Sequence, residues 1–224
     1  MDVETLNKLG VKPIQSELDK VSAIKSKADL VTYFARSQVI GGGTPMAFYI
    51  GVDAKDSSRY ATHIWQYGLS LPEKDYYFNQ DERFVKIRKA FVDHIEKMYT
   101  LAGLANPKAS AEAVLALETS IAEQHWDVVE TRDSTKTYNL YPVKDLPTLA
   151  PDINWDGYLA TLGADKQADI IINQPSYIQG LNVVIKNTDL ATWKTYMQWQ
   201  VLTHAASSLS EELDKENFEF FSKT

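Results

Sequence analysis

The region that most constrains the fold is residues 82–128, where apolar side chains recur at helical spacing. After the start NQDE, the first apolar stripe consists of Phe84, Ile87, Phe91, Ile95, Met98 and Ala102. Gly103 ends this helix, and Asn106 and Pro107 begin the next one. The second stripe consists of Val114, Leu117, Ile121 and Val128. Two long amphipathic helices joined by a short connection predict an antiparallel helical hairpin.

The residues before this hairpin predict two helices and one pair of strands. Residues 13–25 read as a helix with proline in its first turn, and the capping box SKAD at 26–29 leads into another, which the glycines at 41–43 end. Residues 46–67 are rich in aromatic and β-branched side chains and are interrupted by AKDSS. They predict a β-hairpin with a five-residue loop, the only convincing pair of strands in the chain.

Prolines interrupt the chain after residue 140 before helical patterns return. We expect a short helix in INWDGYLATLG capped by Asp152, and DIIIN fits a brief strand or a buried extended segment equally well. Further helices are predicted from Pro175, after a cap at Thr188, and in SEELDKENFEFFSKT. The expected fold is therefore mainly α, a multi-helix bundle-like domain with one β-hairpin at about 46–67.

Composition excludes several classes of function. Lys and Arg total 23 against 30 Asp and Glu, a net charge of −7, and the basic residues are scattered, so we expect no nucleic-acid partner. No apolar run approaches the length of a membrane span, so we expect no membrane contact from this segment. The absence of cysteine excludes disulfides, thiolate zinc sites and a cysteine nucleophile. The absence of an N-glycosylation sequon favours a bacterial origin.

The sequence offers no catalytic or metal-binding pattern. The four histidines, in HIWQY, HIEKM, HWDVV and HAASS, never begin HExxH, and each is expected to be a partly buried or surface imidazole with one hydrogen-bond partner. GGGT at residue 41 follows a helix and precedes a strand, so a helix stop explains it better than an anion cradle. A solvated helix face explains Glu118, Glu123 and Glu130 better than acid–base chemistry.

Arg132 and Asp133 end the second long helix of the predicted hairpin. A guanidinium there can bind the last free carbonyls and a carboxylate, which would close the helix onto the loop that carries Tyr138 and Asn139. Binding a substrate carboxylate is the competing role for Arg132. The structural role is favoured, because helix C-termini commonly gain cations in this way.

Five blocks carry a resemblance to a known family: VDAKDSSRYATHIWQYGLSLPEKDYYF, LETSIAEQHWDVVETRDSTKTYN, DINWDGYL, QPSYIQGL and WKTYMQWQVL. In this order and spacing, residues 1–224 resemble the N-terminal region of the neprilysin family of zinc metallopeptidases, which includes endothelin-converting enzymes and bacterial oligopeptidase O. The resemblance implies a structural family motif rather than catalytic groups. Its residues are Asp53, Gly68, Pro72, Asp75, Tyr76, Tyr77, Arg132, Asp133, Tyr138 and Asn139.

The resemblance also implies a function. Family members enclose a cavity between a helical lid and a catalytic domain, which holds zinc with HExxH and a downstream glutamate and cleaves peptides. This chain would be a fragment of the lid, with no cofactor of its own and with zinc in the parent enzyme. Its partners would be the catalytic domain of the same polypeptide and peptide substrates. The missing paired cysteines of animal members favour a bacterial parent, placed in the cell envelope or periplasm rather than the cytoplasm.

The last residues fit this interpretation, because Phe218, Phe220 and Phe221 require burial close to the end of the sequence. We expect an internal piece of a larger protein, incomplete without the rest of the parent, with an exposed apolar surface where the catalytic domain docks. The alternative is a free-standing helical interaction module without enzymatic activity.

Overall fold

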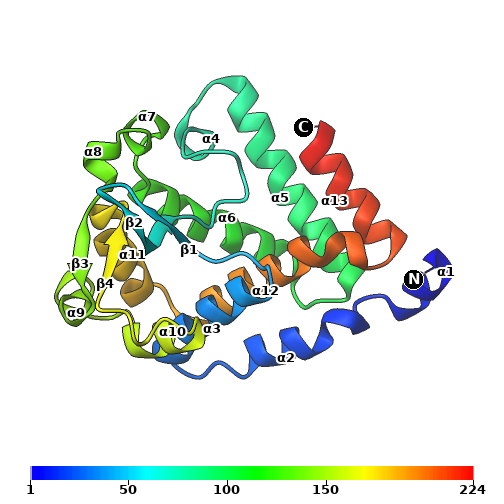
Figure 1. Cartoon of the computed structure of the whole chain (residues 1–224). Helices are drawn as coiled ribbons and strands as arrows, with labels where there is room; N and C mark the ends of the chain where they lie inside the picture. Colours follow the sequence, from blue (N-terminus) through cyan, green and yellow to red (C-terminus); the bar gives the residue numbers. More distant parts are fainter. Residues whose placement is uncertain (1, 224) are drawn as a thin grey trace.

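Helices form most of residues 2–223, the part of the chain that the computed structural model describes (Figure 1). The helices before the sheet are α1 Val3–Leu9, the 3-10 helix η1 Lys12–Ile14, α2 Gln15–Ser22 and α3 Lys27–Val39. Those that follow the hairpin are α4 Asp75–Phe78, α5 Glu82–Ala102, α6 Pro107–Gln124, α7 Val128–Thr131 and α8 Ser134–Thr137. The remainder are η2 Val143–Asp145, α9 Leu146–Leu149, α10 Trp155–Thr161, α11 Pro175–Asn187, α12 Leu190–Ala205, η3 Ala206–Ser208 and α13 Glu211–Lys223.

Helix α12 forms the centre of the core. It contacts α2, α3 and α6, and Figure 1 shows it crossing the middle of the molecule. Its side chains Trp193, Trp199 and Leu202 are fully buried, although helical spacing places Leu202 on the side opposite Trp193. A helix that is apolar on all sides is stable only when other elements surround it. Helix α13 packs alongside α5, which in turn pairs with α6 as the predicted helical hairpin.

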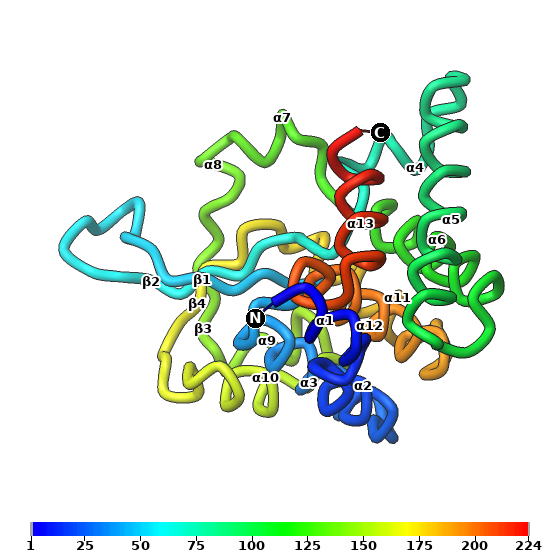
Figure 2. The backbone as a smooth tube through the Cα atoms, turned by 90° about the vertical axis from the view of Figure 1, so that its right-hand side faces the viewer, coloured from blue at the N-terminus to red at the C-terminus, as the bar shows by residue number. Residues whose placement is uncertain are grey.

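The strands form one four-stranded sheet in the order β1-β2-β4-β3. Its members are β1 Met46–Asp53, β2 Asp56–Gln66, β3 Leu140–Pro142 and β4 Asp169–Ile172. β1 and β2 are antiparallel, β2 and β4 are parallel, and β3 and β4 are antiparallel. The β1–β2 hairpin projects beyond the helices (Figure 2). The mainly α fold with a hairpin at 46–67 is confirmed, and DIIIN contributes a true strand.

The hairpin loop is shorter than predicted. β1 continues to Asp53 and β2 begins at Asp56, so two residues connect them rather than five. The pairing of the two strands is irregular near the turn. Val52 pairs with Tyr60, but the next residue, Asp53, pairs with Asp56, so the extra residues of this bulge belong to β2. The Asp53 carboxylate accepts a hydrogen bond from the Lys55 backbone 2.8 Å away, which turns the chain immediately after β1.

The second long helix is also shorter than predicted, because α6 ends at Gln124 and Val128 belongs to the separate helix α7. The side-chain amide of Gln66 explains the break. It accepts a hydrogen bond from the Trp126 backbone nitrogen at 2.8 Å and donates one to the Trp126 carbonyl at 3.1 Å. These long-range bonds replace the intrahelical bonds that Trp126 would otherwise make.

Other helix ends differ from prediction by a few residues. The 13–25 helix is split into η1 and α2 and ends at Ser22. Asn154, not Asp152, caps α10, and Asp152 instead accepts a bond from Asn182 at 2.9 Å. Asp189, not Thr188, caps α12. In the last two cases a neighbouring polar side chain, Asn154 or Asp189, accepts the hydrogen bond from a free N–H group of the first helical turn. None of the helices formed by the described residues is long and apolar enough to cross a membrane.

Candidate functional site

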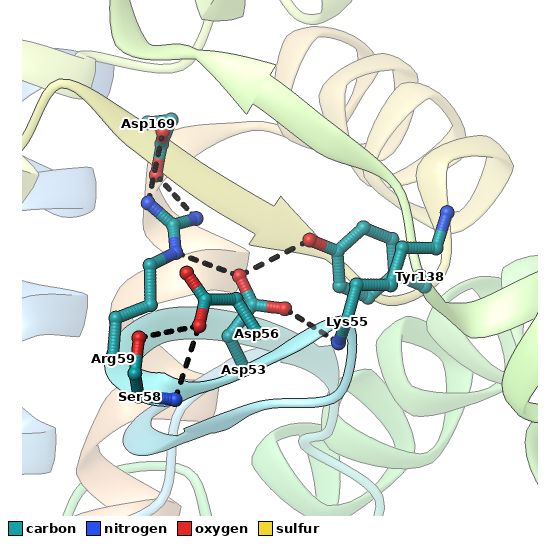
Figure 3. Close-up of polar contacts among 7 residues, drawn as sticks. All are labelled: Asp53, Lys55, Asp56, Ser58, Arg59, Tyr138 and Asp169. Atoms are coloured by element: carbon teal, nitrogen blue, oxygen red, sulfur yellow. Dashed lines mark hydrogen bonds and ion pairs between the residues drawn. The ribbon is translucent and has the colours of Figure 1, made fainter.

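Asp53 is the centre of a polar network at the end of the hairpin (Figure 3). Its side chain is 1% exposed and accepts hydrogen bonds from Lys55 N at 2.8 Å, Arg59 Nε at 2.8 Å and Tyr138 Oη at 3.1 Å. The backbone N–H of Lys55, followed by Arg59 and Tyr138, lowers the pKa of Asp53 to about 2. Asp53 is therefore ionised at neutral pH, and both of its oxygens accept hydrogen bonds.

Arg59 ties this network to the rest of the sheet. Its guanidinium pairs with Asp53 on one side and with Asp169 of β4 on the other, where Nη2 lies 3.3 Å from Oδ1. The two carboxylates raise the pKa of Arg59 above its usual range. Lys55 completes the arrangement, with its ammonium 4.3 Å from the centre of the Tyr138 ring. Three residues of the hairpin, Asp53, Lys55 and Arg59, and one from each of two distant segments, Tyr138 and Asp169, thus fix the hairpin tip (Figure 3).

Glu118 is the centre of a second network, inside the helical core. It is completely buried on α6 and accepts hydrogen bonds from Ser70 N at 3.0 Å, Ser70 Oγ at 2.6 Å and Tyr77 Oη at 2.6 Å. Within residues 2–223 it forms no ion pair. Burial raises the pKa of Glu118 to about 7 in spite of these hydrogen bonds. The carboxyl group anchors the segment between β2 and α4 to the core.

The three aromatics of DYYF have different surroundings. Tyr77 is buried and, besides bonding to Glu118, accepts a hydrogen bond from Leu71 N at 3.0 Å. Tyr76 packs edge-on against Phe84 with ring centres 5.1 Å apart. Phe78 is 40% exposed. The run therefore meets different neighbours on different sides, and α4 is held between the core and α5.

An open cavity of about 350 Å³ lies beside the Glu118 network. Ser70 connects the two, because it lines the cavity and its hydroxyl also accepts a hydrogen bond from Trp199 Nε1 at 2.9 Å. The remaining lining residues are Tyr67, Gly68, Leu69, Gln200, Thr203, His204, Asn217 and Phe221. The lining is mixed, with amide, hydroxyl and imidazole groups beside aromatic rings. It can bind polar groups but presents no activated nucleophile.

The structure brings some of the ten sequence-predicted residues together and separates others. Asp53 and Tyr138 bond directly, whereas Tyr77 belongs to the Glu118 network. Gly68 has φ of +97°, and a Cβ there would lie 2.7 Å from Tyr196 Oη. Pro72 lines a smaller cavity of about 220 Å³. Their membership of a family motif stays a prediction.

The remaining predicted residues lie in separate local structures. Asp75 begins α4, Asp133 caps α8 through Thr135 N, and Asn139 donates to the Ile172 carbonyl at 3.2 Å. Arg132 follows α7 rather than a long helix and is exposed. Its guanidinium makes no hydrogen bond or ion pair with the described residues, so the closing role expected for Arg132 is not seen.

Three of the four histidines have one hydrogen-bond partner, as expected. His94 bonds to Glu216, His125 to the Tyr67 carbonyl and His204 to the Gln200 carbonyl. Burial lowers the pKa of His125 to about 4. His63 differs, because it is buried, stacks on Tyr49 with ring centres 4.5 Å apart, and has no hydrogen bond to either ring nitrogen.

No cluster of three or more histidine, aspartate or glutamate side chains within residues 2–223 could hold a metal ion. The residues described here therefore do not fit a zinc site.

Sequence reasoning missed Arg59 and Asp169 and misjudged Glu118. Arg59 and Asp169 are 110 positions apart, and nothing local signals that they meet. Glu118 was expected on a solvated face and is instead fully buried. The signal was available, since Glu118 lies four residues after Val114 and three before Ile121, within the apolar stripe.

Comparison with known proteins gives matches that agree on one family. The N-terminal model of Peptidase family M13 matches residues 1–224. Endothelin-converting enzyme 1 of Cavia porcellus is 27% identical over 179 residues, 77% of this chain and 24% of that protein. Endothelin-converting enzyme-like 1 of Homo sapiens is 23% identical, covering 94% of this chain and 29% of that protein.

The fold has a solved counterpart. The zinc metalloprotease Zmp1 of Mycobacterium tuberculosis, in complex with an inhibitor, matches with a TM-score of 0.93 and 30% identity. The match covers 99% of this chain and 34% of that one. The chain thus spans about a quarter of the curated relatives, 24% and 29%, and about a third, 34%, of the solved structure.

Proposed function

The chain belongs to Peptidase family M13, and from this we propose that it is the non-catalytic helical lid of a zinc-dependent oligopeptidase. The observation that carries the proposal is the match of the family model to residues 1–224, together with the similarity to a zinc metalloprotease over 99% of the chain. In the proposed enzyme, zinc and the catalytic groups lie in another part of the polypeptide. These residues restrict access to peptides and exclude folded proteins.

The chemistry of the described residues supports a structural role. The carboxylates with the best-defined surroundings, Asp53 and Glu118, each accept three hydrogen bonds that hold chain segments together. Neither lies beside an imidazole that it could activate or orient through a hydrogen bond. The clusters of histidine and carboxylate that a zinc site requires are missing from residues 2–223.

The aromatic residues of α13 support docking of a partner. Phe220 is buried against Phe91 and His94, but Phe218 is 58% exposed and Phe221 is 46% exposed. Phe221 also lines the cavity beside Ser70. We propose that the catalytic domain of the same polypeptide covers this surface. The isolated chain would then bind a hydrophobic dye more strongly than the complete enzyme does.

Two measurements on the full-length gene product test the function. We expect one zinc per molecule and cleavage of peptides up to a limiting length, with folded proteins left intact. Changing His63, His94, His125 or His204 singly to asparagine should leave the zinc content unchanged, because none of them is a ligand in this proposal. Loss of zinc in any of these variants would overturn the lid assignment.

A further experiment uses residues 1–224 alone. We expect no stoichiometric zinc and no peptide cleavage. A full-length protein without zinc and without peptidase activity would instead favour the free-standing interaction module. Placement in the bacterial cell envelope stays part of the proposal, and fractionation of the producing cells tests it.

A further inference from the structure

The outer edge of β1 is open at the end of the sheet. β1 is the first strand in the order β1-β2-β4-β3, so only β2 pairs with it. At Phe48 this edge is closed by the side chain of Gln38, whose amide accepts a hydrogen bond from Phe48 N at 2.9 Å and donates one to the Phe48 carbonyl. The Gln38 amide thus occupies the place of a neighbouring strand at this one position.

The position of Gln38 shows which backbone groups of β1 point outward. In an antiparallel pair, successive residues direct their N–H and C=O groups alternately toward the partner and away from it. Phe48 directs both groups outward to Gln38, so Ile50 and Val52 also direct theirs outward, whereas Tyr49 and Gly51 face β2. No side chain among the described residues covers these outward groups, in contrast to Phe48.

The side chains beside this open edge are apolar and exposed to solvent. Ile50 is 67% exposed and Val52 is 52% exposed. Val52 pairs directly with Tyr60, which is 75% exposed, so the three side chains share one face of the hairpin. Exposed edge strands are usually protected by charge, proline or a covering element. From Ile50 to Val52 the edge has an apolar row instead.

The edge is also held in place. The Asp53 network fixes the turn directly after Val52, and Arg59 connects it to β4 (Figure 3). The hairpin projects clear of the helices, so a partner could reach the edge without displacing them (Figure 2). A rigid, accessible edge binds a strand with a smaller loss of conformational entropy than a mobile one.

We propose that the β1 edge from Ile50 to Val52 binds an extended peptide segment by strand addition. The inference rests on the proposed function, because peptides are the molecules that such a lid admits. The pairing of Gln38 with Phe48 shows that this edge already accepts an amide partner, and the bound segment would continue the same ladder toward the turn. Apolar side chains at alternate positions of the peptide would contact Ile50, Val52 and Tyr60.

Binding is measured with residues 1–224 and a dye-labelled nine-residue peptide that alternates valine and serine and has blocked ends. We expect saturable binding by fluorescence anisotropy. The same peptide with alternate backbone nitrogens methylated should bind about tenfold more weakly, since it loses its ladder hydrogen bonds. Hydrogen exchange should slow at the amides of Ile50 and Val52 on binding, while Gly51, which already faces β2, serves as an internal control.

A matched pair of variants separates the edge from general hydrophobicity. Val52→Lys adds a charge at the edge and should weaken binding about fivefold or more. Val129→Lys changes a valine that is 79% exposed on α7, away from the edge, and should leave binding unchanged. Equal binding of the methylated peptide, protection elsewhere in the chain, or pairing of the edge with a second copy in light scattering would each overturn the inference.

The result is separable from the proposed function. If the full-length protein cleaves peptides but the edge binds none, only this inference fails. If the edge binds the peptide but the full-length protein cleaves nothing, only the proposed function fails.

Discussion

Asp53 and Glu118 are both removed from water, and each accepts three hydrogen bonds, yet their pKa values are shifted in opposite directions. At the hairpin tip, the Lys55 backbone and the Arg59 guanidinium lower the pKa of Asp53 to about 2. In the helical core, burial raises the pKa of Glu118 to about 7, because no cation balances the desolvation. The number of hydrogen bonds therefore does not decide the charge state. The partner charge and the depth of burial do.

The two networks also hold different parts of the molecule. Asp53 connects the turn of the hairpin to Tyr138, 85 positions further along the chain, and its partner Arg59 is partly open to solvent. Glu118 connects α6 to the segment that precedes α4, where neighbouring side chains such as Trp199 and Tyr196 are fully buried. Loss of the first should loosen one hairpin, and loss of the second should weaken the whole fold.

The largest effect is expected from Glu118→Ala. It leaves the Ser70 amide and the Tyr77 hydroxyl without a partner and opens a cavity, so we expect a loss of about 4 kcal/mol in the free energy of unfolding. Glu118→Gln is the matched control. At pH 5, where Glu118 is protonated, the glutamine should stay within about 1 kcal/mol of the natural chain. Urea unfolding measures both, and equal loss in the two variants would contradict the hydrogen-bond explanation.

The second prediction concerns pH. The pKa of Glu118 rises from 4.5 to about 7 on folding, so the folded state retains a proton that the unfolded state loses. The contribution of Glu118 to stability is therefore greatest below pH 4.5, declines as the pH rises to 7, and is constant above it. Relative to the natural chain, Glu118→Gln should gain on the order of 2–3 kcal/mol between pH 5 and pH 8. A pH-independent difference between the two proteins would show that Glu118 does not titrate in this range.

The contrast between the networks also shows what the sequence can predict. Helices α5, α11 and α12 are readable because their signals are local, namely apolar residues together with Gly103 at the end of α5 and Pro175 at the start of α11. Burial of the stripe on α6 extends to Glu118 by its helical spacing. The end of α6 is not readable, because the Gln66 amide that stops it comes from β2, 60 positions away.

The hairpin network was only partly predictable for the same physical reason. Asp53 and Tyr138 entered through a family resemblance, but the residues that give Asp53 its low pKa include Arg59, which lies in a block that carries the resemblance but was not singled out as a member of the motif. Its second partner, Asp169, lies on a strand that reaches β2 only through a parallel pairing. Charge partners across a sheet depend on the complete topology, which no local pattern contains.

The third prediction tests whether the Asp53 network acts locally. Asp53→Asn removes the charge that Arg59 and the Lys55 backbone recognise, so hydrogen exchange across residues 52–60 should become severalfold faster while the midpoint of thermal unfolding changes little. The control is Asp56→Asn on the same turn, because Asp56 is exposed and bonds only within the turn, to Ser58. Faster exchange throughout α6 and α12 would show that the tip is coupled to the core.

The same substitution should change the response to acid. The pKa of Asp53 falls from 3.8 to about 2 on folding, so its contribution is present above pH 3.8 and is lost as the pH falls toward 2. The exchange rates of the natural hairpin should therefore approach those of Asp53→Asn near pH 2. This trend is opposite in direction to that of Glu118.

The smallest effect is expected from Arg59→Lys. Arginine bonds to Asp53 through Nε at 2.8 Å and to Asp169 through its two terminal nitrogens at 3.3 and 3.4 Å. A lysine keeps the charge but lacks the planar group that reaches both carboxylates at once. Asp53 should stay ionised and the turn should stay closed, while the connection to β4 is lost.

Hydrogen exchange distinguishes these two consequences. In Arg59→Lys the amides near Asp169 should exchange faster than in the natural chain, and those of the turn at Lys55 should change less than in Asp53→Asn. The control is Arg83→Lys, since Arg83 is exposed on α5 and makes no side-chain bond to the described residues. If Arg59→Lys instead matches Asp53→Asn across the whole hairpin, the bridge to β4 and the closure of the turn are one cooperative unit. The contrast with Glu118 would then be between two cooperative networks rather than between a local and a global one.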